Sequence, residues 1–428
     1  MGKIESDIPV DPPLETVKTD QSSEIRNGEL DGPLMLKEPK QIVFVLGAGR
    51  ASTDAAVAIS LQLRAENATM PIYFYYTGRI AYDTAVGHSY VLKEGLRRCG
   101  KVKILAHQQR NFGRRVATLF NLLLFFMSLV MHRSLVFIAP RSDTFPMQPI
   151  PFLSRLGGGS CSALKSFQAP FNDTMILHWE RDNPHRVRPY RFLPDYCVFS
   201  HPQQHVFFSK FIETPWKAIG TFHAYPAWRQ FCELLVAKQG VMDIDGRHRP
   251  VEKGPVFIVL GEERIIPKGY VRPGAARDQM RTTLKILKET APDATVVIKP
   301  HPGFDRAELE SLVGEFLSET TFISDAHVAL LAKLGDAVFS GAASSAFLNF
   351  CFERTPVVET TLYDPVLNPT GRSKVEIKGH VYAKTESEIA AVVHRIVDGN
   401  AVDLASDPSD IVHLLTDSLT SQLWIKVA

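Results

Sequence analysis

The stretch ATVVIKPHPG (Ala294–Gly303) is followed further along the chain by DAVFSGAASSAFLNFCFERTPVV (Asp336–Val358). Each begins with a short apolar run typical of a buried strand and ends in a polar turn, and the second continues into a helical pattern. In a parallel α/β sheet, such turns come together at the carboxyl edge of the strands, where ligands of these folds bind. The two stretches therefore predict neighbouring βα units of one parallel sheet.

The same alternation of short apolar runs and helical patterns extends from Gln41 to His201 and restarts at Pro255, which is typical of βαβ units. Among these elements we expect a strand at Thr174–Glu180 and helices at Ala275–Thr290 and Glu386–Val397. Residues 202–254 between them show no clear period. We therefore predict an α/β protein with two doubly wound, Rossmann-type domains facing a cleft. The expected division is a disordered tail at 1–40, a first domain at 41–201, an interdomain connection at 202–254, a second domain at 255–405, and a C-terminal helix at 406–428 that can cross back to the first domain.

Length and composition agree with this division. A chain of 428 residues exceeds one ordinary core, and 45% hydrophobic with 22% charged residues is typical of a soluble globular protein. The five cysteines are far apart and mostly in apolar surroundings, so we expect reduced thiols in a cytosolic protein. The net charge is only +2, yet Glu94 is the one acidic residue between Lys93 and Arg141, among many basic ones. This asymmetry predicts a positive potential on one side of the first domain.

The two polar turns of the second domain supply Lys299, His301, Ser344 and Ser345. A single histidine after a strand is usually structural, and serines are common at helix N-caps. In this order, within βα units of one sheet, the four residues predict a phosphate-binding site.

Three other motifs have simpler explanations. LGAGRAS (Leu46–Ser52) lacks the third glycine of a dinucleotide fingerprint, so we expect a tight turn into a helix, with Asp54 facing the cleft. Asp243-Ile244-Asp245 runs into Gly246 and predicts a surface turn. Pro202 argues against a helix that would align His201 with His205. We therefore expect no metal site and no bound cofactor.

The run VATLFNLLLFFMSLVM (Val116–Met131) is the one candidate for contact with a membrane. At about 1.5 Å per residue it is shorter than a hydrocarbon core of about 30 Å, so we do not expect it to span. We expect a helix buried beside a sheet. The alternative is an apolar patch, flanked by membrane-facing Arg114, Arg115 and Arg133, that rests on an anionic membrane surface.

KPHP followed by SGAASSAFLNFCFERTPVV resembles the carboxyl-terminal domain of GT-B-fold transferases that build bacterial surface polymers. These are the capsule polysaccharide and Kdo transferases, the polysialyltransferases with their His-Pro motif, and the CDP-glycerol glycerophosphotransferases. In the last family a Ser-Ser pair, an acidic residue and a proline form a pattern whose places are held here by Ser344-Ser345, Asn349 and Pro356. The resemblance implies a metal-independent glycosyltransferase that uses a CMP-sugar or a CDP- or UDP-linked donor in surface polysaccharide or glycoconjugate synthesis. It also implies a glycan or lipid-linked acceptor, no nucleic-acid partner, and a cytoplasmic protein that can lie peripherally at the inner face of the membrane.

The resemblance also suggests roles for residues. His301 would assist the leaving phosphate, Lys299 and the Ser344–Ser345 turn would bind the donor phosphate, and Asn349 would contact the ribose or base. The first domain would hold the acceptor and supply the general base. The candidates in order of preference are Asp54 and His88, followed by Glu180 and Asp182.

Two alternatives remain open. One is a nucleotide-sugar epimerase of the UDP-N-acetylglucosamine 2-epimerase type, which shares the fold but needs carboxylates deep in the cleft. The other is a catalytically silent GT-B-like subunit that binds or scaffolds. The sequence does not identify the sugar, the acceptor, the stereochemical course or the oligomeric state.

Overall fold

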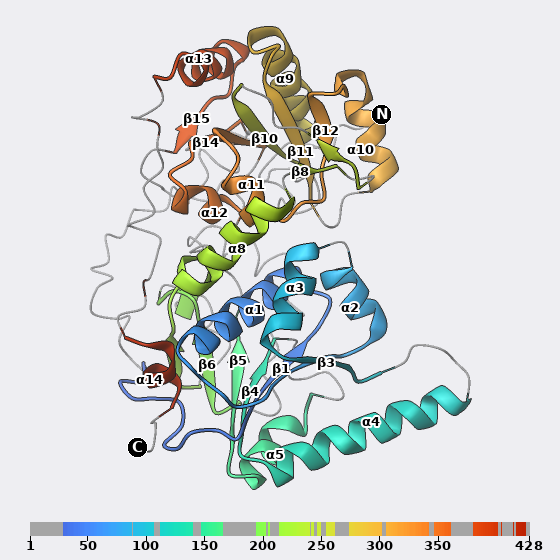
Figure 1. The fold of residues 1–428 in the computed structure, drawn as a ribbon, viewed down its shortest axis with the longest axis vertical. Helices are drawn as coiled ribbons and strands as arrows, with labels where there is room; N and C mark the ends of the chain where they lie inside the picture. Colours follow the sequence, from blue (N-terminus) through green and yellow to red (C-terminus); the bar gives the residue numbers. More distant parts are fainter. Residues whose placement is uncertain are drawn as a thin grey trace, which may run out of the picture.

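The computed structural model describes residues 29–87, 89–106, 112–139, 147–165, 194–202, 204–205, 214–239, 241–243, 246–249, 254–261, 274–301, 305–341, 346–360, 380–400, 404, 414 and 417–424. These residues form two parallel β-sheets, each flanked by helices on both faces, with one helix between the two domains (Figure 1). The expected α/β architecture of two Rossmann-type domains is confirmed.

The first sheet has seven parallel strands in the order β3-β2-β1-β4-β5-β6-β7. Its strands are β1 (Gln41–Leu46), β2 (Ile72–Tyr76), β3 (Lys101–Ile104), β4 (Ser134–Ile138), β5 (Ser160–Leu164), β6 (Tyr196–Phe199) and β7 (Trp216–Ala218). Its helices are α1 (Arg50–Ala65), α2 (Arg79–Val86), α3 (Tyr90–Cys99), α4 (Phe112–Met131) and α5 (Ile150–Leu156). The strand expected at Thr174–Glu180 lies outside the described residues.

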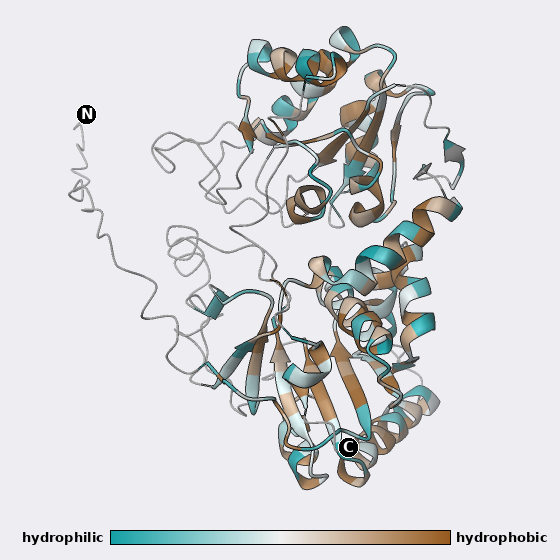
Figure 2. Cartoon of the chain, turned by 60° about the vertical axis from the view of Figure 1, so that its left-hand side comes forward, coloured by the Kyte–Doolittle hydropathy of each residue, from teal (hydrophilic) through white to brown (hydrophobic). Residues whose placement is uncertain are grey.

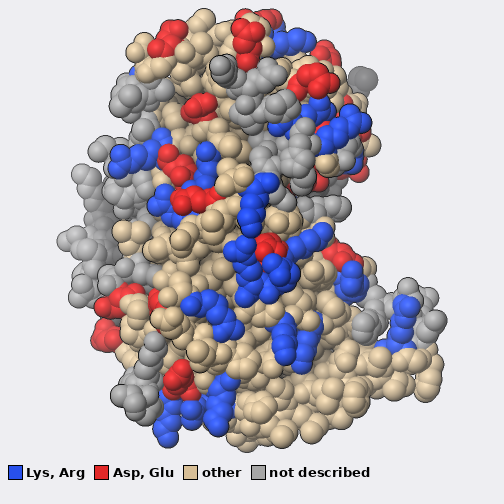
Figure 3. Space-filling view, in the orientation of Figure 1, with Lys and Arg blue, Asp and Glu red and all other residues tan. Residues whose placement is uncertain are grey.

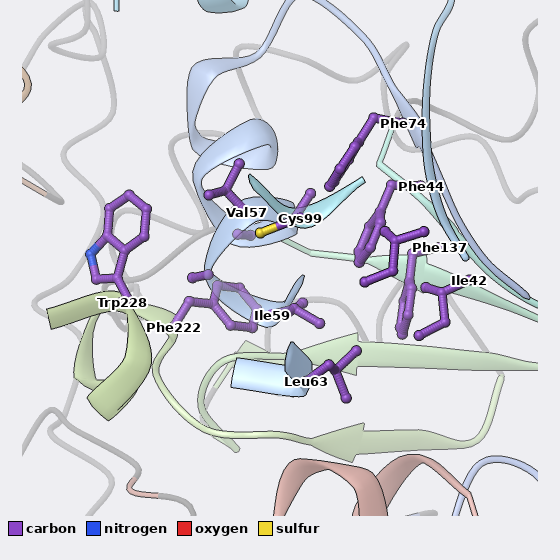
Figure 4. Packing of buried hydrophobic residues seen from close by; sticks show 14 of the residues in the cluster. Ile42, Phe44, Val57, Ile59, Leu63, Phe74, Cys99, Phe137, Phe222 and Trp228 are labelled. Atoms are coloured by element: carbon purple, nitrogen blue, oxygen red, sulfur yellow. The ribbon is translucent and has the colours of Figure 1, made fainter. Parts of the chain in front are cut away.

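Strand β1 is buried on both faces, and its alternate residues enter two different cores. Phe44 stacks on Phe74 and Phe137, with ring centroids 5.5 and 5.0 Å away, and the three rings form a row across the sheet (Figure 4). On this face the sheet packs against α1, whose Val57, Ile59 and Leu63 are fully buried. The core thus fixes the start of α1 at the carboxyl edge of the sheet.

Helix α4 covers part of the opposite face, and only part of it is buried. Leu122, Phe125 and Leu129 are its buried residues and pack towards the sheet, while most of its other large apolar side chains are exposed. Figure 2 shows this helix as largely hydrophobic along its length. The expectation of a helix buried beside the sheet is therefore wrong for most of α4, since only one stripe of it meets the sheet.

The second sheet has six parallel strands in the order β12-β11-β10-β13-β14-β15. Its strands are β10 (Val256–Gly261), β11 (Thr295–Pro300), β12 (Thr321–Ile323), β13 (Ala337–Ser340), β14 (Val357–Glu359) and β15 (Val381–Tyr382). Its helices are α9 (Ala275–Thr290), α10 (Arg306–Val313) with the 3-10 turn η4 (Gly314–Phe316), α11 (Val328–Ala332), α12 (Phe347–Phe352) and α13 (Glu386–Val397). Helices α9, α10 and α13 cover one face, and α11 and α12 cover the face towards the first domain.

The segment 202–254, expected to be an irregular connection, contains regular elements. Besides β7 it includes the 3-10 turn η3 (Phe222–Ala224), helix α8 (Pro226–Gln239) and an antiparallel pair formed by β8 (Val241–Met242) and β9 (His248–Arg249). Helix α8 lies between the domains (Figure 1). It packs on α1 through Trp228 and Phe231, and across the interface Lys333 Nζ lies 3.2 Å from Glu233 Oε1.

Two segments from opposite parts of the chain, residues 29–40 and 417–424, lie against the first domain. Residues 29–40, which were expected to belong to a disordered tail, instead lie against the first domain: Leu34 is buried, and the Met35 N–H donates to the carbonyl of Leu423. The short helix α14 (Leu419–Leu423) packs near the end of α1, where Glu66 accepts the backbone N–H groups of Leu419 and Thr420. A carboxylate at this helix start satisfies its free N–H groups.

Candidate functional site

The strand order of the second sheet reverses direction at the end of β10. This first strand of the domain lies between β11 and β13, so the connections leave it in opposite directions at that point. In the register, Gly261 of β10 pairs with Pro300 of β11, and Leu260 pairs with Ser340 of β13. The carboxyl ends of β11 and β13 thus flank the end of β10, which is the point where doubly wound sheets bind ligands.

Lys299, near the end of β11, is a buried amine that has no hydrogen bond within the described part of the chain. Its residue exposure is 8%, and its Nζ lies 3.8 Å from Asp325 Oδ1, beyond hydrogen-bond distance. Burial lowers the pKa of Lys299 to about 8, and nearby Arg50 acts in the same direction, while Asp325 opposes the shift. An ammonium held in this way is costly unless an anion joins it.

His301 and Arg50 lie close to this amine. Burial, then Lys299 and then Arg50, lower the pKa of His301 to about 4, so this imidazole is neutral at pH 7. Arg50 is the first residue of α1 and belongs to the other domain. Its Nε is buried and has no hydrogen bond to any described residue. Three nitrogen-bearing side chains from two domains therefore converge at the end of β11.

The serine pair Ser344–Ser345 and the histidine His88 lie outside the described residues, as do Glu180 and Asp182. Helix α12, which follows the serines, has only six residues. The expected contribution of Ser344 and Ser345 to phosphate binding therefore stays a prediction.

Asn349 is buried at the start of α12. It is 5% exposed, and its Nδ2 donates to the carbonyl of Ala346 at 3.3 Å, within the first turn of α12. The side chain is used to close that turn. The expected ribose contact of Asn349 stays a prediction, and this buried position at the helix start does not favour it.

Asp54 lies at the domain interface, as its position one turn into α1 suggested, but it is already bound. Its Oδ1 lies 2.9 Å from Nε2 of His327, which stands just before α11 in the second domain. Nδ1 of His327 accepts the backbone N–H of Ala329, so in the neutral ring the proton is on Nε2 and is donated to Asp54. Asp54 is therefore not a free general base in this arrangement.

The surroundings of Asp54 favour its charged form. Burial opposes ionisation, but His327, His223 and Arg50 outweigh it and hold the pKa of Asp54 below its ordinary value. His223 is itself fully buried, and burial lowers its pKa to about 4. Trp228 of α8 stacks beside His223 and meets the edge of His327, with ring centroids 6.0 and 5.8 Å away. The Asp54–His327 pair is thus packed beside aromatic rings at the interface between the domains.

The other motifs are structural. Asp243 lies in the turn between β8 and β9, where its carbonyl accepts the Gly246 N–H and Arg249 Nε lies 2.9 Å from its Oδ2. The expected turn is present, but Asp243 itself is buried and not at the surface. His205 stacks on Trp216 at 4.4 Å. In the ranges that the structure describes, no three His, Cys, Asp or Glu side chains come together as a metal site.

Sequence reasoning found Lys299, His301 and Asp54 but missed Arg50, Asp325 and His327. Arg50 could have been noticed, since it directly follows the Gly-Ala-Gly turn at the cleft edge. The Asp54–His327 contact spans 273 positions in the chain, and no local signal connects two such residues.

No protein-family model matches the chain, and a search of curated proteins found no significant match. Solved structures do resemble it. A proposed UDP-N-acetylglucosamine 2-epimerase from Listeria monocytogenes aligns with a TM-score of 0.51 at 11% identity, over 87% of this chain and 92% of that one. The S. aureus MnaA–UDP co-structure aligns with a TM-score of 0.49 at 10% identity, over 86% and 92%. The calicheamicin glycosyltransferase CalG4 aligns with a TM-score of 0.41 at 12% identity, over 85% and 91%. At such identities the first likeness shows the fold, which is GT-B, and nothing finer.

Proposed function

We propose that this protein is a glycosyltransferase that binds a nucleotide-activated sugar at the carboxyl edge of the second sheet. The observation that carries the proposal is the buried ammonium of Lys299, with Arg50 and His301 beside it. Among the described residues this ammonium makes no hydrogen bond, and its ion pair with Asp325 is long, at 3.8 Å. A phosphate or diphosphate would meet the ammonium of Lys299 and the guanidinium of Arg50 at once, beside His301. A CMP-sugar and a CDP- or UDP-linked donor share that chemistry.

In the transfer step, these groups would stabilise the charge that grows on the leaving phosphate. Lys299 and Arg50 meet an anion already present in the donor, so they mainly hold it. His301 is neutral at pH 7 and would donate its ring N–H to a phosphate oxygen as the glycosidic bond breaks. Because Arg50 comes from the first domain and the other two from the second, the bound phosphate would also hold the domains together.

The acceptor would lie on the first domain, near the exposed Ala48–Gly49 turn that follows β1. Asp54 is close to this turn, but its carboxylate is bound to His327, so we assign it to holding the interface. Asp54 is therefore no longer our preferred general base, and His88 remains a candidate for that role.

Asp325 supports a second candidate, an epimerase. Its side chain is 33% exposed beside Lys299, and a carboxylate at that place could move a proton on a bound sugar. The transferase is preferred because an epimerase of this type needs carboxylates deep in the cleft, whereas Asp325 is held 3.8 Å from the ammonium of Lys299.

The test begins with thermal unfolding in the presence of UDP, CDP or CMP, with the matching nucleosides as controls. A nucleotide at 100 times its dissociation constant adds about 2.7 kcal/mol of stability, and the nucleoside should add far less. Sugar donors of the nucleotide that binds are then incubated with and without glycan acceptors, in EDTA and in magnesium. Acceptor-dependent release of the nucleotide supports the proposal, interconversion of the sugar without acceptor would identify an epimerase, and no stabilisation by any nucleotide would overturn both.

A further inference from the structure

The outer face of α4 is an apolar stripe that the described part of the chain leaves uncovered. The helix has 20 residues, about 30 Å in length, and by length and composition alone it could cross a membrane, yet only 17% of its most apolar window is buried. The exposed large side chains follow helical spacing: Val116, Leu119, Phe120, Leu123, Leu124, Met127, Val130 and Met131. An uncovered patch of this kind marks an interaction surface.

Helix α5 extends the same surface. It packs beside α4 and exposes Phe152 and Leu156, at 57% and 58%. In Figure 3 the lower edge of the molecule, where α4 runs, is a broad band without charged atoms. We call these ten exposed residues of α4 and α5 the apolar edge.

Basic side chains flank the apolar edge in the described part of the chain, and Arg155 of α5 is paired with Asp195. Arg114 and Arg115 are exposed in the first turn of α4, and neither α4 nor α5 contains an acidic residue. Strand β3 adds the exposed Lys101 and Lys103, and it adjoins α4 because Asn121 Nδ2 donates to the carbonyl of Ile104 at 3.4 Å. Lys and Arg beside an apolar surface complement anionic lipid headgroups.

Arg133 does not share in this surface. Its Nε and Nη2 donate to the backbone carbonyl of Glu38 at 2.9 and 2.6 Å, so it anchors the segment before β1. Its expected membrane-facing role stays a prediction, which this contact with the backbone does not favour. Only Arg114 and Arg115 of the three expected arginines remain free to meet headgroups.

The geometry points to a lipid surface as the partner: we propose that the apolar edge inserts into the interface of an anionic membrane while α4 lies along it. The helix cannot span a bilayer while the domain is folded, because Leu122, Phe125 and Leu129 are packed on the sheet. A second copy of the chain is a poorer partner. In a two-fold symmetric dimer the apolar edges of two copies would face each other. The basic residues at the start of each α4 would then have no acidic partner on α4 or α5 of the other copy.

The experiment is flotation of the full chain with vesicles of phosphatidylcholine, with and without phosphatidylglycerol, at low and high salt. We expect binding to the anionic vesicles that weakens with salt. Leu119→Glu/Leu123→Glu should lower the affinity more than about ten-fold, since it places two charges in the interface. Arg114→Ala/Arg115→Ala should lower it by about five-fold for each arginine removed.

Two double variants serve as matched controls. Leu234→Glu/Leu317→Glu changes leucines exposed at 49% and 41% outside the apolar edge, and Arg281→Ala/Lys285→Ala removes two exposed charges of α9. Both should bind vesicles like the unchanged protein, and circular dichroism should show all variants folded. Absence of flotation with anionic vesicles at low salt would overturn the proposal, and so would unchanged binding by Leu119→Glu/Leu123→Glu. A dimer in solution that this variant turns into a monomer would identify a second copy as the partner instead.

Discussion

Asp54 of the first domain and His327 of the second are joined across the domain interface, with Oδ1 and Nε2 2.9 Å apart and both side chains nearly buried. The bond is directional, because Nδ1 of His327 is occupied by the N–H of Ala329. The pair stands one turn of α1 away from Arg50, whose charge acts on Asp54, Lys299 and His301 alike. The interface and the proposed phosphate site therefore share one electrostatic environment.

The first prediction concerns this pair. Asp54→Ala leaves the N–H of His327 buried without its acceptor, which should lower the free energy of unfolding by about 1–3 kcal/mol at pH 7. Asp54→Asn keeps an oxygen acceptor and should cost less. Asp83→Ala is the control, because Asp83 pairs with Arg79 at the surface and should cost less than about 1 kcal/mol. Urea unfolding measures all three, and an Asp54→Ala protein as stable as the parent would contradict the prediction.

The same pair predicts how the difference depends on pH. The pKa of Asp54 is lowered in the folded protein, so its charge stabilises the fold above its ordinary pKa and this stabilisation is lost as pH falls through the lowered value. The stability gap between the parent and Asp54→Asn should therefore be full at pH 6 and shrink below about pH 4. A gap that stays constant down to pH 3 would show that the charge of Asp54 is not what stabilises the interface.

The sequence predicted elements wherever a local pattern is strong. The expected helices at Ala275–Thr290 and Glu386–Val397 match α9 and α13 residue for residue, since each has an amphipathic pattern and the second begins with a capping box. Strand β5 was missed because SCSAL is weakly apolar. Which residues of α4 are buried could not be predicted from the sequence, because apolar residues occur all round this helix and do not mark one face for the core. The site residues that one domain contributes could be predicted from local motifs. Arg50 and His327 could not, because they come to this region only through contacts between the two domains.

The third prediction concerns Lys299 and stability. Its pKa falls from 10.5 to about 8 in the folded protein, so the charged amine destabilises the unliganded fold below pH 8, by up to about 3 kcal/mol. Lys299→Met should therefore raise the free energy of unfolding at pH 7, and the gain should vanish towards pH 10.5, where both states are neutral. Lys285→Met, which changes an exposed lysine, should have little effect. A destabilised Lys299→Met protein at pH 7 would show that the amine already has a partner.

The fourth prediction uses the same pKa for binding. A diphosphate is fully ionised above pH 7, so its affinity should follow the charge of Lys299, with a dissociation constant that rises roughly ten-fold from pH 7 to pH 9. Lys299→Arg keeps its charge over this range and should remove the pH dependence. Isothermal titration with the nucleotide that binds would measure both proteins, in buffers of different ionisation enthalpy to detect proton uptake. An equal rise in both would place the titrating group elsewhere.

The last prediction separates His301 from Lys299. Because the pKa of His301 is about 4, the neutral ring acts as an N–H donor, and activity should stay level from pH 5 to pH 7. If the imidazolium were required, activity would fall about ten-fold per pH unit above pH 4.

His301→Ala should lower kcat by about 10²–10³ while changing nucleotide affinity little, because the ring meets charge that grows only as the bond breaks. His301→Gln retains a donor and should recover part of the loss, and His394→Ala, at an exposed position of α13, is the control. Equal losses in kcat and in nucleotide affinity would instead make His301 a ground-state phosphate ligand like Lys299.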